Sequence, residues 1–214
     1  FVAEGWSLKK LHRLIVTSAV YQQAAAGAEI AAAAKAAATK DPENRLLWRY
    51  PTRRLDAEQV RDAMLATTGE LSQGDGGPSA GWEKPRRTIF TKVMRNSRDS
   101  LLDVFDPPDG FLSTSARNST TTSTQALTLF NGDFVNEQAE HFAARLIREA
   151  GTDPRKQLNH AFKLALARLP TEVEHEGMLR FLEERPPGDA AKSNAGLVQV
   201  CRVILNLNEF VYPD

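Results

Sequence analysis

Helix-start signals recur through this 214-residue chain and constrain its fold more than any other feature. Three capping boxes place an oxygen-bearing N-cap three positions before a Gln or Glu: Asp56 with Gln59, Thr122 with Gln125, and Thr171 with Glu174. In a capping box the two side chains satisfy backbone N–H groups that the first helical turn leaves unpaired. Apolar residues at helical spacing follow each box, so we predict a mainly α-helical, bundle-like domain.

The last predicted helix, roughly Ala190–Asn208, is apolar on nearly all sides from Leu197 to Leu207. A helix of this kind is buried among others, and we expect it at the centre of its bundle. It carries the single cysteine, Cys201, which we expect to be a buried small hydrophobe. One cysteine forms no disulfide within the chain.

Thr88–Met94 (residues 88–94) is a short segment that alternates loosely between apolar and polar residues. It is the one candidate for an extended or β segment. A single strand is not stable alone, so it needs a partner segment or lies extended over helices. A further helix is predicted after Asp41, where Pro42 takes the first helical position and Pro51 stops the helix.

The domain organisation predicted from composition is a single mostly helical domain over residues 1–214. The chain starts in mid-pattern at Phe1, and we expect it to be a fragment of a larger multidomain protein. Ala24–Lys40 is nearly all alanine, favours helix and buries little area, so we interpret residues 24–40 as an Ala-rich connector. Gln73–Pro85 is rich in Gly and Pro, and residues 73–85 are predicted to form an exposed loop.

Charge and histidine usage exclude several function classes. The 27 basic and 27 acidic residues cancel, so no global field draws the chain to nucleic acid or a membrane. No apolar run approaches the roughly 18 residues that a membrane span needs. The four histidines are scattered outside any H-E-x-x-H spacing, and no C-x-x-C-H haem motif occurs. We therefore expect no metal site, no cofactor in this chain and no membrane span.

The charged stretch in the middle of the chain is the first candidate for chemistry. Five cations come before four acids: Arg86, Arg87, Lys92, Arg95 and Arg98, then Asp99, Asp103, Asp106 and Asp109. Arg95 and Arg98, together with Arg117 and Asn118, could converge on a phosphate, sulfate or carboxylate. In the alternative interpretation, which we favour, these arginines pair with the four aspartates and fix loops to helices. Nucleic-acid binding through the cations is a weaker alternative, because the acids follow at once.

Two further features carry candidate residues. Asp106 and Asp109 flank two prolines and are weak candidates for a catalytic acid and base, although Asp at such turns usually bonds backbone N–H groups. Ser119–Thr124 lacks a nearby histidine to activate a hydroxyl, so we assign this run to capping and turns. Trp82, in the Gly-rich loop, is the tryptophan that we expect to contact a ligand.

Several ordered phrases in this sequence resemble a known family. They are Gly5–His12 with Ile15–Tyr21, Asn44–Arg49 with Arg53–Leu55, Arg86–Phe90 with Arg95–Asn96, Phe105–Asp106 with Pro108–Asp109, Thr124–Asn131, Arg168 with Pro170–Thr171, and Leu205–Asn206 with Asn208–Phe210. Together they resemble the C-terminal domain of unknown function of planctomycete-type proteins that contain cytochrome-c domains.

The resemblance implies a large multidomain parent, periplasmic or secreted, with haem c bound elsewhere in that parent. It supplies no reaction and no catalytic residues. Our leading interpretation is a non-catalytic interaction or scaffold module whose partners are other domains of the same parent. The alternative is a hydrolase, or a domain that binds an anionic or glycan-type ligand, using the Arg/Asp cluster at residues 95–118.

Overall fold

The computed structural model describes residues 1–23, 32–72, 74, 77–94, 99–108, 115, 117–183 and 190–213. The chain divides into two compact units: Phe1–Arg53 with Tyr212–Asp214, and Arg54–Val211. The described residues form α-helices, one short 3₁₀ helix and isolated β-bridges, so the predicted mainly α-helical, bundle-like fold is confirmed. No helix in the described part of the chain combines the length and apolarity needed to cross a bilayer. Whether the whole chain acts as a single domain stays a prediction.

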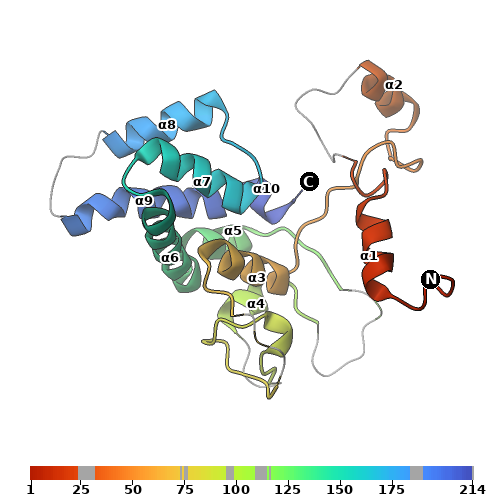
Figure 1. Cartoon of the computed structure of the whole chain (residues 1–214), viewed down its shortest axis with the longest axis horizontal. Helices are drawn as coiled ribbons and strands as arrows, with labels where there is room; N and C mark the ends of the chain where they lie inside the picture. The colour runs from red at the N-terminus through yellow and green to blue at the C-terminus, as the bar shows by residue number, and fades with distance from the viewer. Residues whose placement is uncertain are drawn as a thin grey trace. The chain divides into compact units, whose positions relative to one another are not determined.

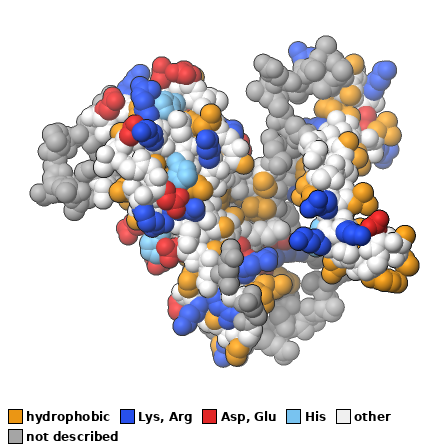
Figure 2. Space-filling model, viewed as in Figure 1, with side chains coloured by type: hydrophobic (Ala, Val, Ile, Leu, Met, Phe, Trp, Pro, Cys, Tyr) orange, Lys and Arg blue, Asp and Glu red, His pale blue; other side chains and the backbone are white. Residues whose placement is uncertain are grey.

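The first unit contains α1 (Leu8–Val16) and α2 (Ala32–Lys40). Ser7 caps α1, since its Oγ accepts from the Lys10 N–H at 3.4 Å. No residue of α1 is buried, although the helix is strongly amphipathic. Figure 2 shows its hydrophobic side chains next to Lys and Arg side chains.

The prediction of a helix after Asp41 is wrong. The Asp41 carboxylate accepts from the backbone N–H groups of Arg45 (2.9 Å) and Leu46 (2.7 Å), which closes a turn. Asn44 and Leu47 then take positive φ angles of 54° and 53°, which no right-handed helix contains. A side chain that bonds nearby backbone competes with helix formation, and here that local bonding prevails.

The second unit is a helical bundle organised around α6 (Asp133–Ala150). Its other helices are α3 (Ala57–Thr68), α4 (Ser100–Val104), α5 (Ser123–Asn131), α7 (Pro154–Leu166), α8 (Glu172–Glu183), α9 (Ala190–Leu205) and α10 (Asn208–Val211). In Figure 1, α7, α8 and α9 lie together on one side of α6, and α3 with α4 lies on the other.

The core of the bundle lies where α9 packs most extensively against α6. Phe142 and Leu146 of α6, Phe162 of α7 and Ile204 of α9 are all fully buried. Cys201 is buried there too, as predicted, and burial raises the pKa of its thiol. The last long helix is therefore central to its bundle, as its apolar pattern indicates.

The segment predicted to be extended begins with a 3₁₀ helix, η1 (Thr88–Phe90). Extended backbone follows it: Thr91 forms an isolated β-bridge with Ala80, and the Lys92 N–H donates to the Ala80 carbonyl at 2.8 Å. The first three residues differ from the prediction because contacts with α3 hold them in a turn, as described below.

Candidate functional site

Arg61, on α3, organises the loop that carries η1. Its guanidinium is buried and donates to four acceptors on that loop. Nη1 donates to the Arg86 carbonyl (2.9 Å) and Thr88 Oγ1 (3.2 Å), and Nη2 donates to the carbonyls of Trp82 (2.7 Å) and Lys84 (2.9 Å). Burial lowers the pKa of Arg61, against the opposing effect of nearby carboxylates. The loop is thus folded around one side chain of α3.

Asp62, the next residue on α3, fixes the start of η1. Its Oδ1 accepts from the Thr88 N–H and from Thr88 Oγ1, both at 2.7 Å. Arg87 lies 3.5 Å from Oδ2, and Arg61 lies 3.9 Å from Oδ1. These contacts explain why the backbone turns at Thr88 instead of continuing as a strand.

A second polar cluster forms at Asp106, directly after α4. We call Arg54, Asp106, Thr120 and Gln125 the Asp106 junction. Asp106 has a φ of 52°, in the left-handed region that non-glycine residues rarely adopt. Its carboxylate accepts from the Thr120 N–H (2.7 Å), from Thr120 Oγ1 (2.8 Å) and from Arg54 Nη2 (3.3 Å). The two Thr120 bonds, followed by the Arg54 contact, hold the pKa of Asp106 below its ordinary value.

Arg54 and Gln125 extend the Asp106 junction to three segments of the chain. Arg54 Nη1 donates to Gln125 Oε1 (2.7 Å) and to the Thr120 carbonyl. The Arg54 guanidinium carbon, Cζ, also lies 5.4 Å from the centre of the Phe105 ring. Gln125 Nε2 donates to the Val104 carbonyl at 3.0 Å. Gln125 is also the third residue of the capping box at the start of α5. The junction therefore joins the entrance to α3, the end of α4 and the start of α5.

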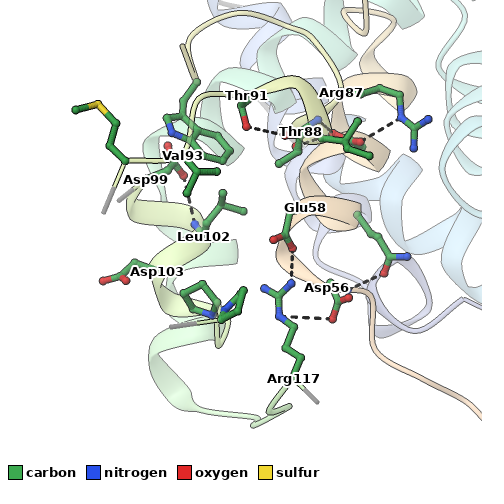
Figure 3. Close-up of a pocket in the computed structure, with 17 residues that line it drawn as sticks. Asp56, Glu58, Arg87, Thr88, Thr91, Val93, Asp99, Leu102, Asp103 and Arg117 are labelled. Atoms are coloured by element: carbon green, nitrogen blue, oxygen red, sulfur yellow. Dashed lines mark hydrogen bonds and ion pairs between the residues drawn. The ribbon is translucent and has the colours of Figure 1, made fainter. Parts of the chain in front are cut away.

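Arg117 connects the Asp106 junction to α3. Nε donates to the Asp106 carbonyl (2.9 Å), Nη2 donates to the Phe105 carbonyl (3.3 Å), and Nη1 donates to Glu58 Oε2 (2.7 Å). Asp56, the N-cap of α3, lies 4.0 Å from Nε. Figure 3 shows Arg117 reaching towards Glu58 and Asp56.

A pocket of about 660 Å³ lies beside this arrangement, between the start of α3, the η1 loop and α4. Its walls mix carboxylates, two arginines and apolar side chains. They are formed by Asp56, Glu58, Gln59, Asp62, Trp82, Arg87, Thr88, Ile89, Thr91, Val93, Met94, Asp99, Leu102, Asp103, Pro107, Pro108 and Arg117. A volume of this size lies within the range of ligand pockets.

Part of the apolar lining of the pocket is exposed to solvent. Val93 is 82% exposed and Ile89 is 76% exposed. Asp99 contributes to the same wall, but its Oδ1 accepts from the N–H groups of Leu101 (3.0 Å) and Leu102 (3.3 Å) as the cap of α4. In Figure 3, Asp103 points to the side away from Glu58.

The structure brings together some of the residues predicted from the sequence. Arg117 and half-buried Trp82 line the pocket. Asp106 lies in the junction next to it, and exposed Asn118 does not contribute to the lining. Arg95, Arg98 and Asp109 lie outside the described residues.

Sequence reasoning missed the acidic wall that α3 provides. Glu58 and Asp62 lie four residues apart, so they share one face of a helix, and this spacing is a signal that the sequence contains. No local pattern places that face against residues 82–94, 99–108 and 117. Within the described residues, no three His, Cys, Asp or Glu side chains converge as metal ligands do.

Two other charge clusters stabilise the bundle away from the pocket. Glu149 of α6 contacts His160 (2.8 Å) and Arg145 (2.9 Å), which lower its pKa to about 2, with the His160 contact the larger cause. Arg168 contacts Glu174 (2.9 Å) and Glu209 (2.6 Å). The Arg168 contact is the main cause that lowers the pKa of Glu174 to about 2.

Residues 1–53 of the first unit, the described lining of the pocket and the Asp106 junction all fall within one family match. A profile described as PSD1, protein of unknown function (DUF1553), matches residues 1–182. The chain belongs to the DUF1553 family. The match ends within α8, so α9 and α10 of this DUF1553 chain lie beyond it. No curated protein and no solved structure matches the chain.

Proposed function

We propose that this DUF1553 chain is a non-catalytic interaction module whose contact surface is the pocket beside α3. One observation carries the proposal. The candidate catalytic carboxylate, Asp106, is engaged by Thr120 and Arg54, whereas the adjacent pocket wall leaves Val93 and Ile89 largely exposed. Exposed apolar side chains around a concave site are typical of surfaces that bind a partner.

The electrostatics of Asp106 also support a non-catalytic role. A general acid or base works best when its pKa lies near the working pH. The pKa of Asp106 is shifted the other way, because Thr120 donates two hydrogen bonds to the ionised carboxylate. A carboxylate stabilised in this way is a good structural acceptor and a poor proton donor.

The proposed setting of the module comes from the family resemblance. We place it in an extracytoplasmic multidomain protein of the planctomycete type, in which other domains carry haem c and provide partners for the pocket. Cell fractionation with haem staining of the full-length parent checks this setting. Haem staining of an extracytoplasmic band is expected, and a cytoplasmic parent without haem would contradict it.

The alternative is a hydrolase or an anionic, glycan-type ligand site at residues 95–118. Trp82 in the pocket lining favours a ligand of this kind, because aromatic rings stack on sugars. Arg117, the arginine of that cluster in the described lining, already donates to Glu58 and to two backbone carbonyls, which weighs against its use for an anion. Loss of glycan hydrolysis in a folded Asp106→Asn variant would establish the alternative.

Site-specific crosslinking tests the interaction role. A photo-crosslinking residue replaces Val93 in the full-length parent, and the same residue replaces Val173 of α8 as a control. Both positions are 82% exposed, so the two variants match in accessibility. We expect a defined adduct from position 93 and none from position 173. Equal, diffuse crosslinking at both positions would contradict the proposal.

A further inference from the structure

We propose that α1 lies in the surface of a lipid bilayer whose headgroups are anionic. In this arrangement lipid covers the apolar face of the helix, and its cationic face contacts the headgroups. The inference concerns the first unit, whereas the pocket of the proposed function is formed by residues of the second unit. It adds a second binding surface to the chain.

The apolar face of α1 lacks a cover within the described part of its unit. Leu8, Leu11, Leu14 and Ile15 share one side of the helix, because they recur three or four residues apart. No residue of α1 is buried, and Leu14 is 69% exposed. No other described residue of the first unit is buried, so these residues form no core that takes up the face. Such apolar surface gains stability when another apolar phase covers it.

The opposite face of α1 is cationic. It carries Lys9, Lys10 and Arg13, and Lys10 pairs with Glu4 at 2.7 Å. Of the 27 basic and 27 acidic residues of the whole sequence, eight and five belong to the first unit. This count includes every residue of the unit, described or not, so with His neutral the unit has three positive charges in excess. The rest of the chain has three negative charges in excess, and the charge of the first unit alone complements an anionic surface.

Two aromatic residues flank α1 as expected of a helix at a membrane surface. Trp6, directly before the Ser7 cap, is 67% exposed, and Tyr21, shortly after the helix, is exposed too. Trp and Tyr favour the boundary between lipid and water, because each ring has an apolar body and a polar group. A helix with Lys and Arg on one face and Leu on the other is typical of helices that lie in this boundary. A second copy of the chain is a less suitable cover, because it brings the same cations together.

Vesicle flotation with the whole 214-residue chain tests the proposal. One set of vesicles contains phosphatidylglycerol and phosphatidylcholine in equal parts, and the other set contains phosphatidylcholine alone. We expect binding to the anionic vesicles that weakens as salt is added, and little binding to the neutral vesicles. Brominated lipid in the anionic vesicles should quench tryptophan fluorescence, and this quenching should be lost in Trp6→Phe.

One pair of variants tests the apolar face. Leu14→Ser is expected to weaken binding to the anionic vesicles about ten-fold, because the leucine no longer enters the lipid. Val173→Ser is the matched control, since Val173 is also largely exposed but lies in the second unit, and binding should stay unchanged.

A second pair tests the cationic face. Lys9→Gln/Arg13→Gln is expected to weaken binding about 30-fold at low salt, because each cation near an anionic membrane contributes to attraction. Arg155→Gln/Lys156→Gln removes two exposed cations from the first turn of α7 and should have a much smaller effect.

Three results would overturn the inference. The first is equal binding of Leu14→Ser and Val173→Ser to the anionic vesicles, or no binding by the unchanged chain. The second is self-association in the absence of vesicles that Leu14→Ser abolishes, since a second copy then covers the face. The third is a loss of thermal stability in Leu14→Ser but not in Val173→Ser, which would mean that the chain itself covers Leu14. Because Val93 and the pocket are unchanged in these variants, each result leaves the proposed function standing.

Discussion

The Asp106 junction and the pocket beside it contain the same residue types in different surroundings. In the junction, the Arg54 side chain is 8% exposed and the Asp106 side chain 19% exposed, and each bonds the other and the start of α5. In the pocket, the arginines and carboxylates surround apolar side chains that remain open to solvent. A cluster of Asp and Arg residues therefore has no fixed role. The chain bonds these groups in both places, as Thr120 does at Asp106 and Thr88 does at Asp62, and the two places differ in whether the apolar side chains beside the cluster stay exposed.

The largest effect on stability is expected where the Asp106 junction loses its cation, Arg54, whose side chain is 8% exposed. Arg54→Leu removes the donors to Thr120 and Gln125 and leaves the Asp106 carboxylate without its cation. We expect the free energy of unfolding to fall by about 3 kcal/mol, as for other broken buried pairs, in urea titrations. Arg148→Leu is the control, because its side chain is 66% exposed. Equal stability of the two variants would show that the junction does not support the fold.

A smaller loss of stability is expected at Arg117, which contacts the Asp106 junction and also lines the pocket. Arg117→Met removes the Glu58 ion pair and two bonds to backbone carbonyls. The side chain is 23% exposed, so we expect a loss of about 1–2 kcal/mol in the same titrations. The matched variant Arg45→Met breaks an ion pair in which Arg45 is 81% exposed and should change stability little. A cost at Arg45 as large as that at Arg117 would contradict the assignment.

Acid pH tests the two charge clusters at Glu149 and Glu174, which lie away from the pocket. The folded-state pKa values of Glu149 and Glu174 are lowered from 4.5 to about 2, so their stabilising contributions are complete above about pH 4.5. These contributions are lost as the pH falls towards 2, because protonation then favours the unfolded state. We expect the free energy of unfolding to fall over this window, with a shallower slope in Glu149→Gln. The control is Glu140→Gln, at an exposed position of α6. An unchanged slope in Glu149→Gln would show that the His160 and Arg145 contacts do not persist in solution.

The smallest effect is expected at the pocket wall. Val93→Ser and Ile89→Ser remove apolar groups that are already exposed, so the free energy of unfolding should change by less than about 0.5 kcal/mol. A loss of several times that amount in thermal or urea unfolding would mean that these side chains are covered in solution, and the wall would then belong to the core.

Local signals in the sequence predict the helices well where side chains bond the backbone of their own first turn. All three capping boxes form: Gln59 Oε1 accepts from the Asp56 N–H (2.9 Å), Thr122 and Gln125 bond each other's N–H groups, and Glu174 accepts from the Thr171 N–H (2.7 Å). At Asp41 the side chain also bonds nearby backbone N–H groups, but there the carboxylate closes a turn where a helix is predicted. An Asp at a helix start therefore caps a helix when its carboxylate bonds N–H groups two and three residues on, as at Asp99 and Asp153, whereas Asp41 bonds those four and five residues on.

The candidate site could be predicted only in part, because its contacts join segments far apart in the sequence. Arg54 and Asp106 are 52 positions apart, and Arg117 and Glu58 are 59 positions apart. The sequence indicates that central arginines and carboxylates are present, but it contains no signal that selects Arg54 as the partner of Asp106. Trp82 lies in the pocket lining, and its contact with a ligand, predicted from its place in a Gly-rich loop, stays a prediction.

The most direct test of this account is the urea unfolding of Asp106→Asn, because the account rests on that carboxylate supporting the fold. The substitution keeps the shape of the side chain but weakens the bonds from Thr120 and Arg54. We predict a free energy of unfolding about 1–2 kcal/mol below that of the unchanged chain, with the same dependence on urea concentration. An unchanged free energy of unfolding would contradict the structural role of Asp106 and return it to the candidates for catalysis.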